Sequence, residues 1–243
     1  MNLLALDTTG ISGSIALLQD GRPLVENSWR ADKSHASELP CQTLQICREA
    51  QIPLSHIDAY AVTLGPGSFT GIRIGLAFVK GLALISQKTV VGVSTLRALA
   101  LGVDEEGLIS PWIDARRGEI YGALFEKRGG ELITLLEARA LSPELFLGEI
   151  TQKMKPSSIL HFLGNGALFY QEKILERSDF KPLFLNEKSQ EVKAGIVGRE
   201  AYRLLKKGEG SKGGIDLYPQ YLRASEAELK IQGSEKPDLT GAQ

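Results

Sequence analysis

Four consecutive residues near the start of the chain have the types that a phosphate-binding turn needs. Asp7, Thr8, Thr9 and Gly10 follow a short apolar run, so hydroxyl and amide donors would lie beside a carboxylate that can orient a metal ion. The same residue types also build ordinary tight turns. The sequence therefore leaves two interpretations of this turn, one functional and one structural.

Two further turns could also face a ligand. Residues 164–166 (GNG) follow an apolar strand and could line an adenine, although a strand-to-helix turn needs the same residues. Residues 114–118 carry guanidinium groups at Arg116 and Arg117, where close approach to a phosphate would favour glycine. These arginines either hold an anion or pair with acidic residues.

A glycine-rich segment at residues 65–75 (GPGSFTGIRIG) fails as a nucleotide loop. A P-loop has Lys and a hydroxyl residue after its last glycine, but Ile72 and Arg73 follow Gly71. The spacing of a dinucleotide-binding loop is also missing. Metal and nucleophile chemistry have no local support either, because no two histidines have helical metal-ligand spacing and no G-x-S-x-G motif occurs.

Composition limits the class of protein. The 243 residues are 43% hydrophobic and 23% charged with a formal net charge of −1, as in ordinary globular proteins, and there is no global positive field to hold nucleic acid. Cys41 and Cys47 would lie on different faces of one helix, so we expect reduced thiols. The first residues lack a signal-peptide core, and the apolar stretch 71–85 is interrupted by charges. We therefore expect a cytoplasmic protein with no membrane span.

The first half of the chain predicts alternating strands and helices, because apolar runs end at turn signals and helical spacing follows. The expected elements are strands at 3–7, 14–18 and 24–29, a helix that begins near Ser37 or Pro40 and ends before Pro53, a strand at 59–64, a helix at 71–86 capped by Thr70, and a strand at 89–93.

The second half repeats this pattern. At one constant offset, Asp7, Ala16 and Leu17 correspond to Asp114, Ala123 and Leu124. The expected elements are strands at 108–114, 119–126 and 131–136, a helix at 143–154, a strand at 159–163, a helix at 167–176, a short strand near Leu183 and a helix at 190–207. The repeat predicts a duplicated α/β fold, with halves at 1–100 and 101–224 and a mobile tail at 225–243.

The helix expected at 71–86 is apolar almost all round. A helix of this kind must be buried on more than one side, and its small residues would allow another helix to approach closely. Burial within the monomer and contact with a partner helix both explain the pattern.

In combination these motifs resemble the bacterial TsaB (YeaZ) family. The resemblance runs from the first strand to about Arg223 and includes the Asp7 turn, residues 65–75, residues 114–117, residues 164–167 and residues 219–223 (PQYLR). It implies the duplicated actin-like ATPase (RNase H-like) fold, with two mixed sheets flanked by helices.

The resemblance also implies a function. A TsaB-type chain would be a non-catalytic subunit that binds and orients TsaD for threonylcarbamoyl transfer to N6 of the adenosine beside the tRNA anticodon. A TsaE-like ATPase would dock on the pair, the same helical face would form a homodimer, and tRNA would be contacted only indirectly. No cofactor would be required, although ATP or ADP could lie at the subunit junction.

Site residues follow from the same resemblance, and no catalytic or metal-binding residue is among them. A vestigial nucleotide site would involve Asp7, Thr8, Thr9, Gly164 and Gly166. The partner interface would comprise His35, Leu39, Thr43, Ile46, Gly71, Ile74, Gly75, Phe78 and Leu82. The alternative is an autonomous actin-fold small-molecule kinase or a metallopeptidase-like enzyme, and an unpartnered homodimer is a third interpretation.

Overall fold

The structure, a computed structural model, describes residues 1–30, 34–177, 179–185 and 190–223. The tail expected at 225–243 lies outside these residues. The strands are β1 Asn2–Asp7, β2 Ser12–Gln19, β3 Arg22–Arg30, β4 Ala59–Gly65, β5 Thr89–Ser94, β6 Gly107–Arg116, β7 Glu119–Arg128, β8 Glu131–Leu141, β9 Ile159–Leu163, β10 Lys181–Phe184 and β11 Ser211–Lys212. The helices are α1 His35–Glu49, α2 Phe69–Ser86, α3 Thr95–Leu101, α4 Pro143–Thr151, α5 Asn165–Phe169, α6 Gln171–Leu175 and α7 Ala194–Lys206, with a short 3-10 helix at Leu54–His56.

Two mixed sheets share one strand order. The first sheet runs β11-β5-β4-β1-β2-β3 and the second runs β10-β9-β6-β7-β8. In each, three antiparallel strands form a meander. One later strand pairs parallel with the first of them, and the next pairs parallel with that later strand. Apart from β11, the second order repeats the first. This confirms the duplicated α/β fold with two mixed sheets, which is the actin-like architecture.

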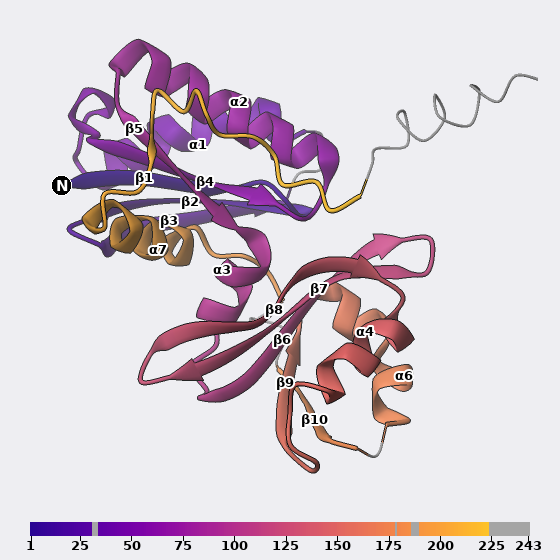
Figure 1. Ribbon diagram of the computed structural model, residues 1–243. Coiled ribbons are helices and arrows are strands. Elements are labelled where there is room, and N and C mark those ends of the chain that lie inside the picture. The colour runs from indigo at the N-terminus through magenta and orange to yellow at the C-terminus, as the bar shows by residue number, and fades with distance from the viewer. Residues whose placement is uncertain (31–33, 178, 186–189, 224–243) are drawn as a thin grey trace, which may run out of the picture.

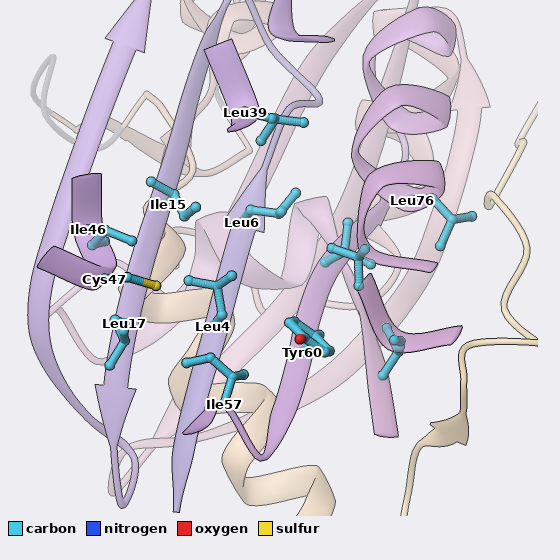
Figure 2. Close-up of a cluster of buried hydrophobic side chains, with 14 of the residues drawn as sticks. Leu4, Leu6, Ile15, Leu17, Leu39, Ile46, Cys47, Ile57, Tyr60 and Leu76 are labelled. Atoms are coloured by element: carbon cyan, nitrogen blue, oxygen red, sulfur yellow. The ribbon is translucent and has the colours of Figure 1, made fainter. Parts of the chain in front are cut away.

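Helices cover both faces of the first sheet, so its central strands are apolar throughout. Alternate residues of β1 point to opposite faces. Leu4 and Leu6 join the core beneath α1 and α2, whereas Leu3 and Ala5 join the core beneath α7. Figure 2 shows the first of these cores, in which Leu39 and other side chains from the helices lie over the strands.

The second sheet is built in the same way. Trp112, Phe146 and Phe162 pack edge to face in the core between the sheet and α4, and the indole nitrogen of Trp112 donates a 2.9 Å hydrogen bond to Ser110 Oγ. The other face packs against α3, which lies between the two sheets (Figure 1).

After leaving the second sheet, the chain returns to the first. Helix α7 contributes Ala194, Val197 and Ala201 to the core of the first sheet, and β11 pairs antiparallel with β5. The expected division at residue 100 does not anticipate this return. Small side chains allow it, because a Cβ on Gly198 would lie 2.3 Å from Leu18 Cδ1.

Several expected helix limits were wrong, because capping side chains set the observed ones. Helix α1 begins at His35, not at Ser37 or Pro40, since Ser34 is extended and its Oγ accepts from the Ala36 amide at 3.1 Å. Helix α2 begins at Phe69, and its cap is Ser68 rather than Thr70, since Ser68 Oγ accepts from the Gly71 amide.

Other differences come from contacts between distant segments. Helix α7 begins only at Ala194, because the preceding residues run beside β2, where Ser14 Oγ donates to the Val192 carbonyl at 3.0 Å. Helix α4 ends at Thr151, and the helix expected at 167–176 is split at Tyr170 into α5 and α6. Helix α3 and strand β11 were not expected at all.

Candidate functional site

The Asp7 turn lies at the carboxyl end of β1 and is buried. Asp7 is 3% exposed, and its Oδ1 accepts hydrogen bonds from the hydroxyls of Thr9 at 2.7 Å and Thr63 at 2.5 Å and from the Thr9 amide at 3.3 Å. Thr63 lies on β4, the strand that pairs with β1. The carboxyl group therefore joins the turn to the neighbouring strand.

Burial dominates the electrostatics of Asp7. Loss of hydration raises the pKa of this carboxyl above its ordinary value, and the hydrogen bonds from Thr63 and Thr9 oppose that rise only in part. A carboxylate that binds a metal-phosphate group must be accessible to that ligand. The carboxyl group of Asp7 is instead enclosed by residues of its own chain.

The first turn of α2 closes the Asp7 turn. Thr8 Oγ1 donates to the Gly71 carbonyl at 2.7 Å, and the Ser68 amide donates to the Thr9 carbonyl at 2.9 Å. A Cβ on Gly71 would lie 1.9 Å from the Thr8 carbonyl oxygen, and one on Gly75 would lie 2.4 Å from Thr8 Oγ1. The glycines of residues 65–75 thus allow helix and turn to meet, and α2 already contacts the Thr8 hydroxyl and the Thr9 carbonyl of the turn.

The second part of the expected nucleotide site packs on β6. A Cβ on Gly164 would lie 2.2 Å from the Trp112 carbonyl oxygen, and one on Gly166 would lie 2.8 Å from the Asp114 amide. Asn165 Oδ1 accepts from that amide at 3.1 Å. These glycines serve contact between α5 and β6, so their local packing supports the structural interpretation of this turn.

The β6–β7 turn places two arginines in the left-handed backbone region. Arg116 has φ 64° and Arg117 has φ 57°, which costs each about 1–2 kcal/mol relative to a right-handed conformation. The Arg116 side chain lies at the surface, with its Nε 3.7 Å from Asp114 Oδ2. For Arg116, this contact matches acidic pairing, which was one of the two interpretations of the arginines.

Most of the expected partner residues face inward. The side chains of His35, Leu39, Thr43 and Ile46 on α1 are buried in the chain's own core, and Gly71 and Gly75 are buried against the Asp7 turn. Their expected place on a binding surface is therefore corrected: these residues face the interior of this chain and pack the helices onto it. Ile74, Phe78 and Leu82 are half-buried and reach the surface.

The predicted interface included Ile74 but missed the most exposed apolar residues of the two helices, Leu84 and Ile85 on α2 and Leu44 on α1. On α2 the outward side chains beside Ile74 are small or apolar, and we call the following five residues the outer face: Ile74, Ala77, Gly81, Leu84 and Ile85. Leu84 is 59% exposed and Ile85 is 87% exposed, and on the neighbouring α1 Leu44 is 54% exposed. Once the buried positions Ile72, Leu76 and Val79 are known, a rotation of about 100° per residue identifies this face on the opposite side of the helix.

Helix α2 is long and apolar enough to cross a membrane by length and composition alone, the one such helix among the described residues. Its inner side is part of a protein core, since Ile72, Leu76 and Val79 are buried against the first sheet. The helix is thus a covering helix of the first sheet whose other side is unusually apolar for a surface.

Metal ligands do not gather anywhere in the described ranges, where no three His, Cys, Asp or Glu side chains come together. His35 Nε2 lies 3.0 Å from the Gly10 carbonyl, and His161 Nδ1 lies 3.2 Å from the Leu108 carbonyl. Each of these two rings is thus held by backbone of its own sheet region.

The fold and this site define an actin-like protein with a closed strand-end turn and an open apolar helix face. The family model described as "TsaD: tRNA N6-adenosine threonylcarbamoyltransferase" matches residues 29–231. Two proteins named "tRNA threonylcarbamoyladenosine biosynthesis protein TsaB" are similar to the chain. The one from Bacillus subtilis is 29% identical over 97% of this chain and 100% of its own length, and the one from Escherichia coli is 35% identical over 52% and 56%.

A solved structure gives the same result. "YeaZ from Pseudomonas aeruginosa" superposes with a TM-score of 0.76 and 30% identity, and the match covers 91% of this chain and 99% of that one. Proteins named as the transferase itself match a much shorter part, such as 28% of this chain for the one from Lawsonia intracellularis. The chain belongs to the TsaB (YeaZ) family, which is related to TsaD and whose members are named for threonylcarbamoyladenosine biosynthesis in tRNA.

Proposed function

We propose that this chain is a non-catalytic partner subunit of tRNA threonylcarbamoyladenosine synthesis. It binds a TsaD-type transferase through α1 and α2 and orients it for threonylcarbamoyl transfer to N6 of the adenosine adjacent to the anticodon. A TsaE-like ATPase docks on the pair, tRNA is bound through the other subunits, and the complex works in the cytoplasm.

The outer face of α2 is the observation that carries this proposal. Ile85 and Leu84 are largely exposed, Gly81 has nothing within 4 Å of the position of a Cβ, and Leu44 on the neighbouring helix α1 is also exposed. Exposed apolar side chains gathered on one face of a helix, as on α2, are typical of protein interaction sites. Small residues between large ones also let a partner helix approach closely.

The Asp7 turn supports a positional role rather than a catalytic one. Its carboxylate, hydroxyls and carbonyls bind each other and α2, so the groups that a kinase would direct at a phosphate are already used. This weighs against the alternative of a small-molecule kinase. The metallopeptidase alternative lacks a ligand set within the described residues.

The geometry explains how such a subunit would act. Burial of the outer face stabilises a complex by about 25 cal/mol per Å² of apolar area, less the cost of immobilising two chains. Helix α2 is anchored by the Thr8 hydrogen bond to Gly71 and by its buried inner side. A partner bound to α2 is therefore held in one orientation relative to the first sheet, which is the contribution that preorganisation makes to catalysis.

The test is co-elution of full-length chains by size-exclusion chromatography with light scattering, using the TsaD-type protein of the same cell. We expect a one-to-one complex that displaces the homodimer. The variant Ile85→Glu should abolish it without loss of fold, because Ile85 makes little contact with its own chain. The matched control is Leu145→Glu on α4, a position that is 63% exposed and lies on the second sheet.

A charge at Ile74 or Phe78 should weaken both the complex and the homodimer, because both would use the same helix. A tRNA modification assay with this chain omitted then measures its contribution to transfer. Independent elution of the two proteins under all conditions, with and without ATP, would refute the proposal. Turnover of ATP with small metabolites would then favour the kinase alternative.

A further inference from the structure

Helix α2 carries two positive charges and no negative one. Arg73 and Lys80 are its only charged residues between Phe69 and Ser86. They lie close to two full helical turns apart, so both occupy the same flank of the helix. Across the described ranges, no carboxylate lies within ion-pairing distance of either side chain.

A C-terminal segment runs along this flank. We call residues 211–223 the strap, and Figure 1 shows it in orange to yellow beside α2. Arg73 Cζ lies 5.5 Å from the centre of the Tyr221 ring, and its Nε donates a 2.7 Å hydrogen bond to Tyr221 Oη. Lys80 Nζ lies 5.2 Å from the centre of the Tyr218 ring. A neutral tyrosine positions a cation without cancelling its charge.

The strap itself is anchored. The Gln220 amide donates to the Leu64 carbonyl at 2.7 Å, and Tyr221 stacks on Phe69 with ring centres 4.8 Å apart. Leu217 packs on the core beneath α2. The two tyrosines therefore contact Arg73 and Lys80 from an anchored segment, along the edge of the outer face.

The result is an apolar surface with a cationic rim on one side. Interfaces commonly have this anatomy, in which a desolvated apolar centre provides affinity and charges at the rim select the partner and raise the association rate. A rim of one sign with no internal counter-charge fits a partner that brings the opposite sign.

We propose that Arg73 and Lys80 are specificity residues of the outer face, and that its occupant is a partner helix with an apolar stripe flanked by carboxylates about 10 Å apart, two turns along that helix. This inference rests on the proposed function and adds to it the chemistry of the partner. The strap tyrosines are positioning residues, because they act on the occupant through the two cations.

A second copy of this chain is the occupant that the rim disfavours. In a two-fold dimer the same patch serves both chains, so a contact of α2 with its symmetry mate brings the cations of both chains into one interface. Like charges at an interface lower affinity. Salt should therefore weaken the heteromeric complex and strengthen the homodimer, because screening removes an attraction in one and a repulsion in the other.

The experiment measures both equilibria with full-length chains at 50, 150 and 500 mM NaCl, values chosen to span about 14 to 4 Å of screening length. Biolayer interferometry gives the Kd for the TsaD-type protein, and sedimentation equilibrium gives the dissociation constant of the homodimer. As salt increases, we expect the heteromeric Kd to rise and the dissociation constant of the homodimer to fall.

The double variant Arg73→Gln/Lys80→Gln should raise the heteromeric Kd about tenfold at 50 mM NaCl. It should also lower the dissociation constant of the homodimer. The matched control is Lys153→Gln/Lys155→Gln, which removes the same charge from exposed positions that follow α4. This control should leave both constants unchanged. Circular dichroism establishes that each variant is folded.

The outcomes separate the two proposals. A complex that forms but is insensitive to both salt and the double variant overturns the role of Arg73 and Lys80 and leaves the proposed function standing. A homodimer that salt and the double variant weaken shows that the rim attracts a second copy, which also overturns the inference. Absence of any heteromeric complex at every salt concentration overturns the proposed function itself.

Discussion

The hydroxyl of Thr8 donates a 2.7 Å hydrogen bond to the backbone carbonyl of Gly71, across the junction of β1 and α2. This contact links the two motifs that looked most like phosphate sites and shows that each is the other's partner. The hydroxyl completes the hydrogen bonding of a buried carbonyl near the helix start, and the glycine provides the space for the turn. The junction is thus a structural joint that fixes the helix carrying the outer face.

The variant Gly71→Ala should therefore destabilise the protein by about 2–3 kcal/mol, because its Cβ would lie 1.9 Å from the Thr8 carbonyl oxygen and neither backbone can move freely. Urea denaturation measures the change. The control is Gly81→Ala on the same helix, where nothing lies within 4 Å of the added Cβ. This variant should be neutral or stabilised by up to about 1 kcal/mol, since Ala favours helix. Equal losses in the two variants would contradict the proposed joint.

Asp7 should make the protein less stable as pH rises. Burial raises the pKa of Asp7 in the folded state, so between its ordinary value of 3.8 and the raised value the folded chain holds a proton that the unfolded chain has released. Stability therefore falls with pH across this window and then levels off. The variant Asp7→Asn should remove that slope, so its free energy of unfolding relative to the native protein should increase from pH 4 upwards.

Asp20 is the control for this experiment. The amino terminus hydrogen-bonds to its carboxyl and lowers the pKa of Asp20, so its contribution is present above its ordinary pKa and is lost as pH falls. The variant Asp20→Asn should thus change the pH profile in the opposite direction. A profile of Asp7→Asn parallel to that of the native protein would show that Asp7 is not held in the buried state described.

Much of the fold could be predicted from local pattern. Apolar runs bounded by turn residues indicate buried strands, as for the residues before Asp7 and the strand that ends at Leu163. The constant offset between Asp7 and Asp114 indicates that the set of strands is duplicated. Helix starts were less accurate. A serine cap such as Ser68 satisfies the first amides of a helix wherever the chain turns, and several nearby residues could have served.

The site was harder to predict, because its character depends on contacts between distant segments. No local signal shows that the glycines of residues 65–75 meet Thr8, or that Tyr221 comes to lie on Arg73 from the far end of the chain. The inward direction of Leu39 and Ile46 was within reach, since helical spacing separates them from Leu44. Amphipathic periodicity predicts which side of a helix is apolar. Which segments pack against that side is determined by the tertiary structure.

Glu200 should stabilise the contact between α7, which covers the first sheet, and α3, which lies between the two sheets. It is buried on α7 and pairs with Arg97 of α3 and with Arg203, both at 2.7 Å, and Arg97 Nη1 donates to the Leu132 carbonyl on β8 at 3.3 Å. Glu200→Gln removes the negative charge between two arginines and should cost about 1–3 kcal/mol at pH 7 by urea denaturation. Glu144→Gln, which breaks an exposed pair with Lys173, should cost no more than about 0.5 kcal/mol.

The pH dependence of this loss distinguishes charge from packing. Burial raises the pKa of Glu200, but hydrogen bonds from Arg203 and Arg97 lower it by more, so the folded value lies below the ordinary 4.5. Its stabilising contribution is therefore complete above that pH and is lost as pH falls through the folded value. The gap between the native protein and Glu200→Gln should close in acid. A difference in free energy of unfolding that stays constant down to pH 3 would mean that Glu200 stabilises the contact between α7 and α3 by packing alone.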